Sequence, residues 1–97
     1  MAKRTNHYKL TLEEISLAKE EDVRNTPFTL EFDNHDNLFH IINAVKNKAI
    51  FEDENQSAEF AIGLKMFTEV MLKNRDQELF KELQPAIAEF MKKLKSK

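Results

Sequence analysis

The sequence has 97 residues, enough for one domain, and its net charge of −2 gives no global attraction to nucleic acid or to an acidic membrane. It contains no cysteine, which excludes disulfide scaffolds, thiolate zinc sites and cysteine nucleophiles. Hydrophobic residues make up 41% of the chain and include eight phenylalanines, so the composition argues against disorder.

The first predicted element is a β-strand over residues 7–17. Apolar residues fall on alternate positions up to Leu12, which is the period of a half-buried strand. The apolar phase then slips by one residue, and a bulge near Glu13 would explain the slip. A second interpretation stays open for residues 11–21, because a Thr-x-x-Glu capping box there is typical of a helix start.

A second strand is predicted over residues 28–33, directly after Pro27, which suits a strand start. Phe28, Leu30 and Phe32 alternate with polar residues and give this strand one aromatic-rich face. Two such strands form a hairpin, which is only marginally stable alone. We therefore expect helices to pack on the apolar face of the hairpin.

Apolar residues at helical spacing predict three helices, over residues 36–49, 57–74 and 78–95. Short polar residues before the first of them can accept hydrogen bonds from its free amides. In the second helix, Ile62 and Met66 project nearly opposite to the main apolar stripe, so this helix is expected to be covered on more than one side.

Gly63, the one glycine in the chain, falls inside the second predicted helix, where glycine costs about 1 kcal/mol relative to alanine. A close crossing by the backbone of another element would make the missing side chain useful, and this is our prediction. The overall expectation is an α+β fold in a single domain over residues 1–97, with a two-stranded antiparallel hairpin packed against three helices. No segment is apolar enough for a signal peptide or a membrane span, which favours the cytoplasm.

Several short sequence motifs in this chain resemble those of a known protein family. They are His7-Tyr8, Asn34-His35-Asp36 with Leu38-Phe39, Gly63-Leu64-Lys65 with Phe67, Val70-Met71-Leu72-Lys73-Asn74-Arg75, Leu79-Phe80, and Phe90-Met91 with Leu94-Lys95. Together they cover nearly the whole chain, which resembles a family of short bacterial proteins catalogued as a domain of unknown function. The resemblance implies a hairpin followed by helices, and it implies no reaction and no ligand.

A metal site is not expected from the three histidines. His35 and His40 are five residues apart, which turns their side chains about 140° from each other on a helix. Catalysis is not expected either. Ser16, Ser57 and Ser96 lack the glycine-rich elbow of a nucleophile, and a single glycine allows no phosphate-binding loop. We therefore expect neither an enzyme nor a bound cofactor.

Binding of a small anion or metabolite is the second functional hypothesis. The residues of this possible site are Asn34, His35, Asp36, Lys73 and Arg75. Free amides at the start of the first helix could face an anion, and the basic side chains follow the second helix. The alternative is a structural salt bridge from Arg75 to Asp36 or Asp33, since surface charge pairs are common.

Self-association or binding of a protein partner is the leading hypothesis. The chain has more large apolar residues than one stripe per helix requires, and such residues either fill a second core layer or face another chain. Ile62 and Met66 are the predicted interface residues. Nucleic-acid binding through the lysine-rich C-terminal segment ranks third, because the overall charge does not favour it.

Overall fold

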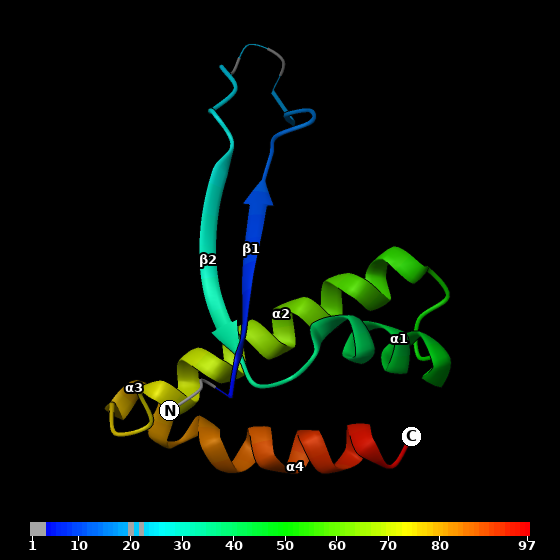
Figure 1. The fold of residues 1–97 in the computed structure, drawn as a ribbon, viewed down its shortest axis with the longest axis vertical. Helices are drawn as coiled ribbons and strands as arrows, with labels where there is room; N and C mark the ends of the chain where they lie inside the picture. The colour runs from blue at the N-terminus through cyan, green and yellow to red at the C-terminus, as the bar shows by residue number, and fades with distance from the viewer. Residues whose placement is uncertain (1–3, 20, 22) are drawn as a thin grey trace. The chain divides into compact units, whose positions relative to one another are not determined.

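The computed structural model describes residues 4–19, 21 and 23–97 (Figure 1). The chain divides into two compact units, Met1–His35, which holds the strands, and Asp36–Lys97, which holds the helices. The predicted α+β fold with a two-stranded antiparallel hairpin and three long helices is confirmed. The single domain over residues 1–97 stays a prediction.

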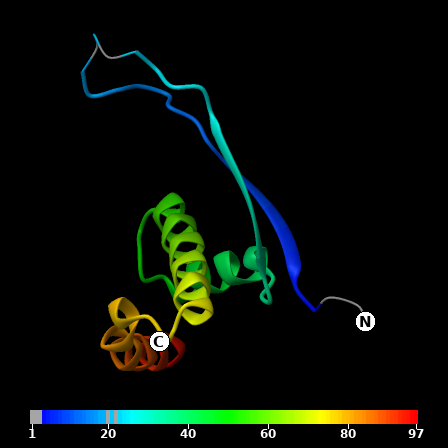
Figure 2. The same ribbon diagram turned by 90° about the vertical axis from the view of Figure 1, so that its left-hand side faces the viewer.

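The hairpin consists of β1 (Asn6–Leu12) and β2 (Phe28–Asn34), which pair in one continuous antiparallel register. Because side chains alternate across a strand, the ladder has two different faces. The apolar face carries the cross-strand pairs Tyr8–Phe32, Leu10–Leu30 and Leu12–Phe28, and the polar face carries His7–Asp33, Lys9–Glu31 and Thr11–Thr29. Figure 2 shows how the two strands twist around each other along the ladder.

The first strand is shorter than predicted. It ends at Leu12, and residues 13–19 form neither strand nor helix, so both interpretations of this segment were wrong where the structure describes it. The register has no bulge, because the segment simply leaves the ladder. Instead, the carboxylate of Glu14 accepts a hydrogen bond from the backbone N–H of Asn25 at 2.5 Å, which ties the two sides of the connector together. Glu20 and Asp22 of the connector lie outside the described residues.

Helix α1 (Leu38–Lys48) begins two residues later than predicted, because its cap is Asn37 and not one of the preceding polar residues. The Asn37 side chain accepts hydrogen bonds from the amides of Phe39 and His40, at 3.0 and 3.2 Å, and satisfies two donors of the first turn. At the other end Ala49 adopts a left-handed conformation with φ of 54°, and its amide donates to the carbonyl of Lys46.

Helix α2 (Glu54–Lys73) begins three residues earlier than predicted, because Asp53 caps it by accepting from the amide of Asn55. It packs on α1, and its buried residues are Ser57, Ala61, Thr68 and Met71, the last two of which line a pocket together with residues of α4. A Cβ built on Gly63 would meet nothing within 4 Å, so the predicted close crossing is wrong for the described residues. Gly63 is exposed in open space.

The last predicted helix is broken in two. A single turn, α3 (Glu78–Lys81), is followed by α4 (Leu83–Lys95), with Glu82 between them. Pro85 is accordingly the third residue of α4, where its missing amide still breaks no hydrogen bond. In Figure 1, α4 leads from α3 back toward the other end of the helical unit, and none of its residues is buried.

The buried part of the helical unit is small. Leu38 and Val45 of α1 and Ala61 and Met71 of α2 are its buried apolar residues. By contrast, eight large apolar side chains of the same unit are exposed, including Phe39, Phe67 and Leu79. None of the helices in the described part of the chain is both long and apolar enough to cross a bilayer.

Candidate interaction site

The apolar face of the hairpin becomes more exposed toward its connector. Tyr8 and Phe32 contact each other with ring centroids 5.5 Å apart, and both are half-buried, whereas the last pair of the ladder, Leu12 and Phe28, lies open. Two apolar residues of the connector are also open. We call the set Leu12, Ile15, Val23 and Phe28 the hairpin end; its members are between 61% and 88% exposed.

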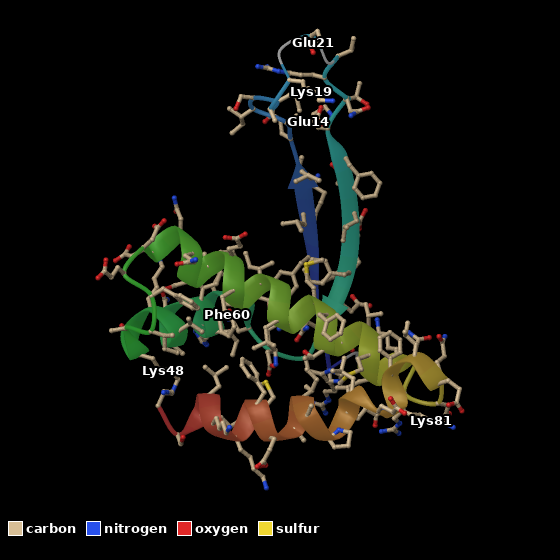
Figure 3. The ribbon with its side chains drawn as sticks, turned by 180° about the vertical axis from the view of Figure 1, so that it is seen from behind. Glu14, Lys19, Glu21, Lys48, Phe60 and Lys81 are labelled. Atoms are coloured by element: carbon tan, nitrogen blue, oxygen red, sulfur yellow. The ribbon has the colours of Figure 1, made fainter. Side chains whose placement is uncertain are left out.

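The hairpin end was missed by the sequence analysis, which assigned apolar residues of the strands to the core. One signal was present: Ile15 and Val23 lie among charged residues and do not continue the period of either strand. The connector around them, residues 13–27, carries five acidic and two basic side chains, a net charge of −3. Figure 3 shows Glu14, Lys19 and Glu21 gathered at this connector. Of the connector residues that the structure describes, Glu13, Glu14 and Glu21 are acidic and Lys19 and Arg24 are basic.

The polar face of the hairpin holds a three-residue ionic cluster. His7 Nδ1 donates to Asp33 Oδ1 at 2.7 Å, and His7 Nε2 donates to Glu31 Oε1 at 2.6 Å. A carboxylate only accepts, so His7 donates both bonds when its ring is protonated as an imidazolium. Both hydrogen bonds raise the pKa of His7 above 6.5, and the bond to Asp33 has a larger effect than the bond to Glu31.

The cluster makes hairpin stability depend on pH. Since the pKa of His7 is higher in the folded hairpin than in the unfolded chain, its two bonds contribute fully below about pH 6.5 and are lost as the pH rises through the raised pKa. We expect the hairpin to be less stable at pH 8.5 than at pH 6. Amide exchange of the β2 residues measures this, and His7→Gln should remove the pH dependence; a variant with the same slope as the parent contradicts the assignment.

The helical unit carries an apolar groove beside α4. The rings of Phe51, Phe60 and Phe90 lie in sequence across it, with centroids 5.3 and 6.2 Å apart. We call the groove of about 280 Å³ the basic groove; it is lined by Ile50, Phe60, Phe90 and Leu94, with Lys93 and Lys97 at its border. Ile50 is 39% exposed and Phe90 is 41% exposed, so the groove is accessible.

Lysines gather in the C-terminal segment that lines one side of the basic groove. Residues 83–97 contain four lysines and one acidic residue, Glu89, a net charge of +3. In the described part of the chain, Lys93 and Lys97 form no side-chain ion pair. A neighbouring groove of about 360 Å³ differs, because Lys65 on its border is paired with Asp36 at 2.5 Å. Lys48, on the same border, donates to the backbone carbonyl of Lys97 at 3.1 Å (Figure 3).

The predicted anion cluster is divided between the two units. Asn34 and His35 belong to the hairpin unit, with Asn34 buried and His35 exposed, while the other three residues belong to the helical unit. Lys73 is the last residue of α2, where it complements the helix dipole, and Arg75 follows it. Both are exposed, and neither takes part in an ion pair within the described residues. The anion site stays a prediction.

The carboxylate of Asp36 pairs with Lys65 of α2, and the alternative salt bridge from Arg75 to Asp36 or Asp33 stays a prediction. Asp33 likewise has a basic partner on its own hairpin, His7. Sequence spacing could not find the Lys65–Asp36 pair, because 29 positions separate the two residues and the packing of α1 on α2 brings them together. The backbone carbonyl of Arg75 accepts a hydrogen bond from Gln84 at 2.9 Å, which links the segment after α2 to α4.

The predicted interface residues Ile62 and Met66 are half-buried, four residues apart on α2. They are less exposed than the four members of the hairpin end, so they are the weaker candidates for a contact with another chain. Within residues 4–19, 21 and 23–97 no three histidine or acidic side chains are grouped so that they could hold a metal ion.

Comparison with known proteins places the chain in a family. A domain of unknown function with a solved structure, DUF3861, matches residues 6–96. The chain belongs to this family. A crystal structure of a protein of unknown function from Pectobacterium atrosepticum SCRI1043 is similar, with a TM-score of 0.81 and 34% sequence identity, covering 95% of this chain and 98% of that one. No curated protein matches the chain.

Membership of DUF3861 confirms the resemblance inferred from the sequence motifs. The match covers all four residues of the hairpin end and every residue that lines the basic groove except Lys97. Neither the family nor the bacterial relative is assigned a reaction, a ligand or a partner. Any function must therefore be argued from the surfaces themselves.

Proposed function

We propose that this protein is a small non-enzymatic interaction module, acting in the cytoplasm, that binds a protein partner or a second copy of itself through the hairpin end. The observation that carries the proposal is the exposure of Leu12, Ile15, Val23 and Phe28, each above 60%. Exposed apolar side chains that cluster, rather than scatter singly, mark interaction surfaces. The absence of cysteine is consistent with a reducing compartment.

The geometry of the ladder supports a role for this patch in binding. Leu12 and Phe28 are directly opposite each other on the apolar face, so their side chains form one surface. A two-stranded hairpin has little stability of its own, and apolar contact with another chain would stabilise its outer half. On the opposite face, Thr11 and Thr29 bond to each other at 3.1 Å, and His7 bonds to both nearby carboxylates. On that face these four polar side chains and His7 bond to one another.

The test is native mass spectrometry of the protein purified gently from its own cells, compared with a Leu12→Thr/Phe28→Thr variant. Threonine keeps the β-propensity of these positions while removing the apolar surface. We expect a dimer or protein complex for the parent and a folded monomer for the variant, with a decrease in affinity of at least about tenfold. Leu79→Ser, at another exposed apolar position, is the control and should leave the assembly intact.

Two results would contradict the proposal. A parent protein that is a bare monomer at every concentration would remove the stable interaction, and an assembly unchanged in the double variant would show that another surface makes it. A monomer that carries a reproducible small-molecule adduct would favour the anion or metabolite hypothesis, and Arg75→Ala would then be the variant to compare.

A further inference from the structure

Three grooves of the helical unit follow one another along α4. The first, of about 320 Å³, is lined by Met71 of α2 and by Ile87 and Met91 of α4. It shares Lys65 and Met91 with the groove of about 360 Å³, which in turn shares Leu94 with the basic groove. Because neighbouring grooves have walls in common, they form one elongated cleft between α4 and the α1–α2 pair, which we call the α4 cleft. Every residue that lines it belongs to the helical unit.

The apolar stripe of α4 lines this cleft without filling it. Ile87, Met91 and Leu94 follow one another at helical spacing and line the cleft, yet all three are only half-buried. Protein interiors are normally packed as closely as organic crystals. Apolar clefts of about 300–1,000 Å³ are the usual form of small-molecule sites. An apolar ligand in the cleft would therefore complete the packing of α4.

The two ends of the α4 cleft differ in charge. Toward the start of α4 the lining is neutral, and in the middle Lys65 is paired with Asp36 at 2.5 Å. Asp36 is the one acidic residue that lines the cleft. The lysines that line the other end are Lys48, Lys93, Lys95 and Lys97. Lys48, labelled in Figure 3, donates to the backbone carbonyl of Lys97 at 3.1 Å, and the other three form no ion pair within the described part of the chain.

The acidic residues near the lysine end lie outside the cleft lining. They are Glu52, Asp53, Glu59 and Glu89, and within the described part of the chain none of them forms an ion pair. Asp53 instead accepts a hydrogen bond from the amide of Asn55 as the cap of α2. These carboxylates lower the positive potential around this end, so the cleft suits a ligand with a single anionic group rather than a polyanion.

We propose that the α4 cleft binds a single unbranched acyl chain that ends in a carboxylate. The carboxylate lies between Lys48 and Lys95, and the chain runs past Met91 toward Ile87. The lining of α4 extends from Gln84 to Lys95, eleven positions apart, or about 16 Å at the rise of a helix. One acyl chain of a bilayer spans half of a hydrocarbon core of about 30 Å, which is a similar length. The inference goes beyond the proposed function and does not depend on the hairpin end.

Isothermal titration calorimetry of the full chain with dodecanoate and dodecanol tests the charged end of the cleft. We expect a single dodecanoate to bind per chain, more tightly than dodecanol. Lys48→Gln/Lys95→Gln should weaken dodecanoate binding at least about tenfold and leave dodecanol binding within about twofold, because only the acid bonds to the lysines. The control Lys81→Gln/Lys92→Gln removes two lysines that do not line the cleft and should change neither affinity.

Chain length tests the neutral end of the cleft. Ala88 lines this end and is exposed, so Ala88→Phe occupies the cleft without displacing a buried side chain. It lies seven positions from Lys95, or about 10 Å along the helix. We expect Ala88→Phe to weaken dodecanoate binding at least about fivefold and to leave the binding of the shorter octanoate unchanged. Far-ultraviolet circular dichroism checks that each variant keeps its helices.

The alternative outcomes each have a distinct meaning. Dodecanoate that does not bind, or that binds equally to the parent and to both cleft variants, overturns the inference. An equal loss in the Lys81→Gln/Lys92→Gln control assigns binding to general surface charge and overturns it as well. A protein that binds vesicles of anionic phospholipid but no free dodecanoate uses α4 at a membrane surface, which excludes the cleft. None of these results decides the proposed function, which depends on the assembly of the Leu12→Thr/Phe28→Thr variant.

Discussion

Replacement of Met71 by alanine should lower the free energy of unfolding of the helical unit by about 2–4 kcal/mol. Met71 is 4% exposed and is one of the buried residues of α2, few of which are apolar. Because the unit has so little buried apolar surface, the remaining side chains cannot close the cavity without moving α1 or α4. Urea unfolding followed by far-ultraviolet circular dichroism measures the loss, with the slope expected to stay constant.

The neighbouring residue provides a matched control for Met71. Leu72 is 53% exposed, so Leu72→Ala removes a side chain of similar size from the same helix while vacating little buried volume. We expect a change within about 0.5 kcal/mol. Equal losses for the two variants would mean that Leu72 is covered in solution, like Met71.

Replacement of Phe60 by alanine should cost about 2–3 kcal/mol, near the lower limit for phenylalanine because the side chain is half-buried. Phe60 lies between Phe51, which follows α1, and Phe90 of α4, and it contacts both rings. Its loss removes the aromatic link that joins α4 to the rest of the helical unit, in addition to apolar burial.

The comparison for Phe60 is Phe39→Ala on α1, where the ring is 69% exposed and should change stability by about 0.5 kcal/mol or less. Near-ultraviolet circular dichroism provides a second readout, because the aromatic packing of Phe60 should disappear only in its own variant. A Phe60→Ala protein as stable as its parent would show that contacts other than those of the Phe60 ring hold α4 in place.

The sequence predicts the elements of this fold better than their limits. Alternation located the ladder correctly up to Leu12, but apolar residues at Ile15 and Leu17 extended the predicted strand into a connector that has no partner strand. Helix starts were displaced because Asn37 and Asp53 cap them, and several short polar residues at each start match the same capping preference. The break at Glu82 has no sequence signal of its own.

The candidate site was harder to predict for a physical reason. Periodicity shows which face of an element is apolar, but it does not show which apolar residues of that face are exposed to solvent. Leu10 and Leu12 lie on the same face of the same strand, yet Leu10 is half-buried and Leu12 is exposed. For Gly63 the sequence predicted that the backbone of another element passes close by, and no described residue does so. Ion pairs such as Lys65–Asp36 depend on helix packing and have no local pattern.

The two-stranded ladder has a consequence for the solvent protection of its backbone. In an antiparallel pair, successive residues direct their N–H groups alternately toward the partner strand and away from it. The described residues form a sheet of two strands, so no third strand among them pairs with the outward edge of β1 or β2. Deuterium uptake along each strand should therefore alternate between slow and fast residues. If a partner chain added a strand to one edge of the sheet, the alternation would disappear in the strand it pairs with. If a partner contacted only the apolar side chains of the hairpin end, the alternation would remain in both strands.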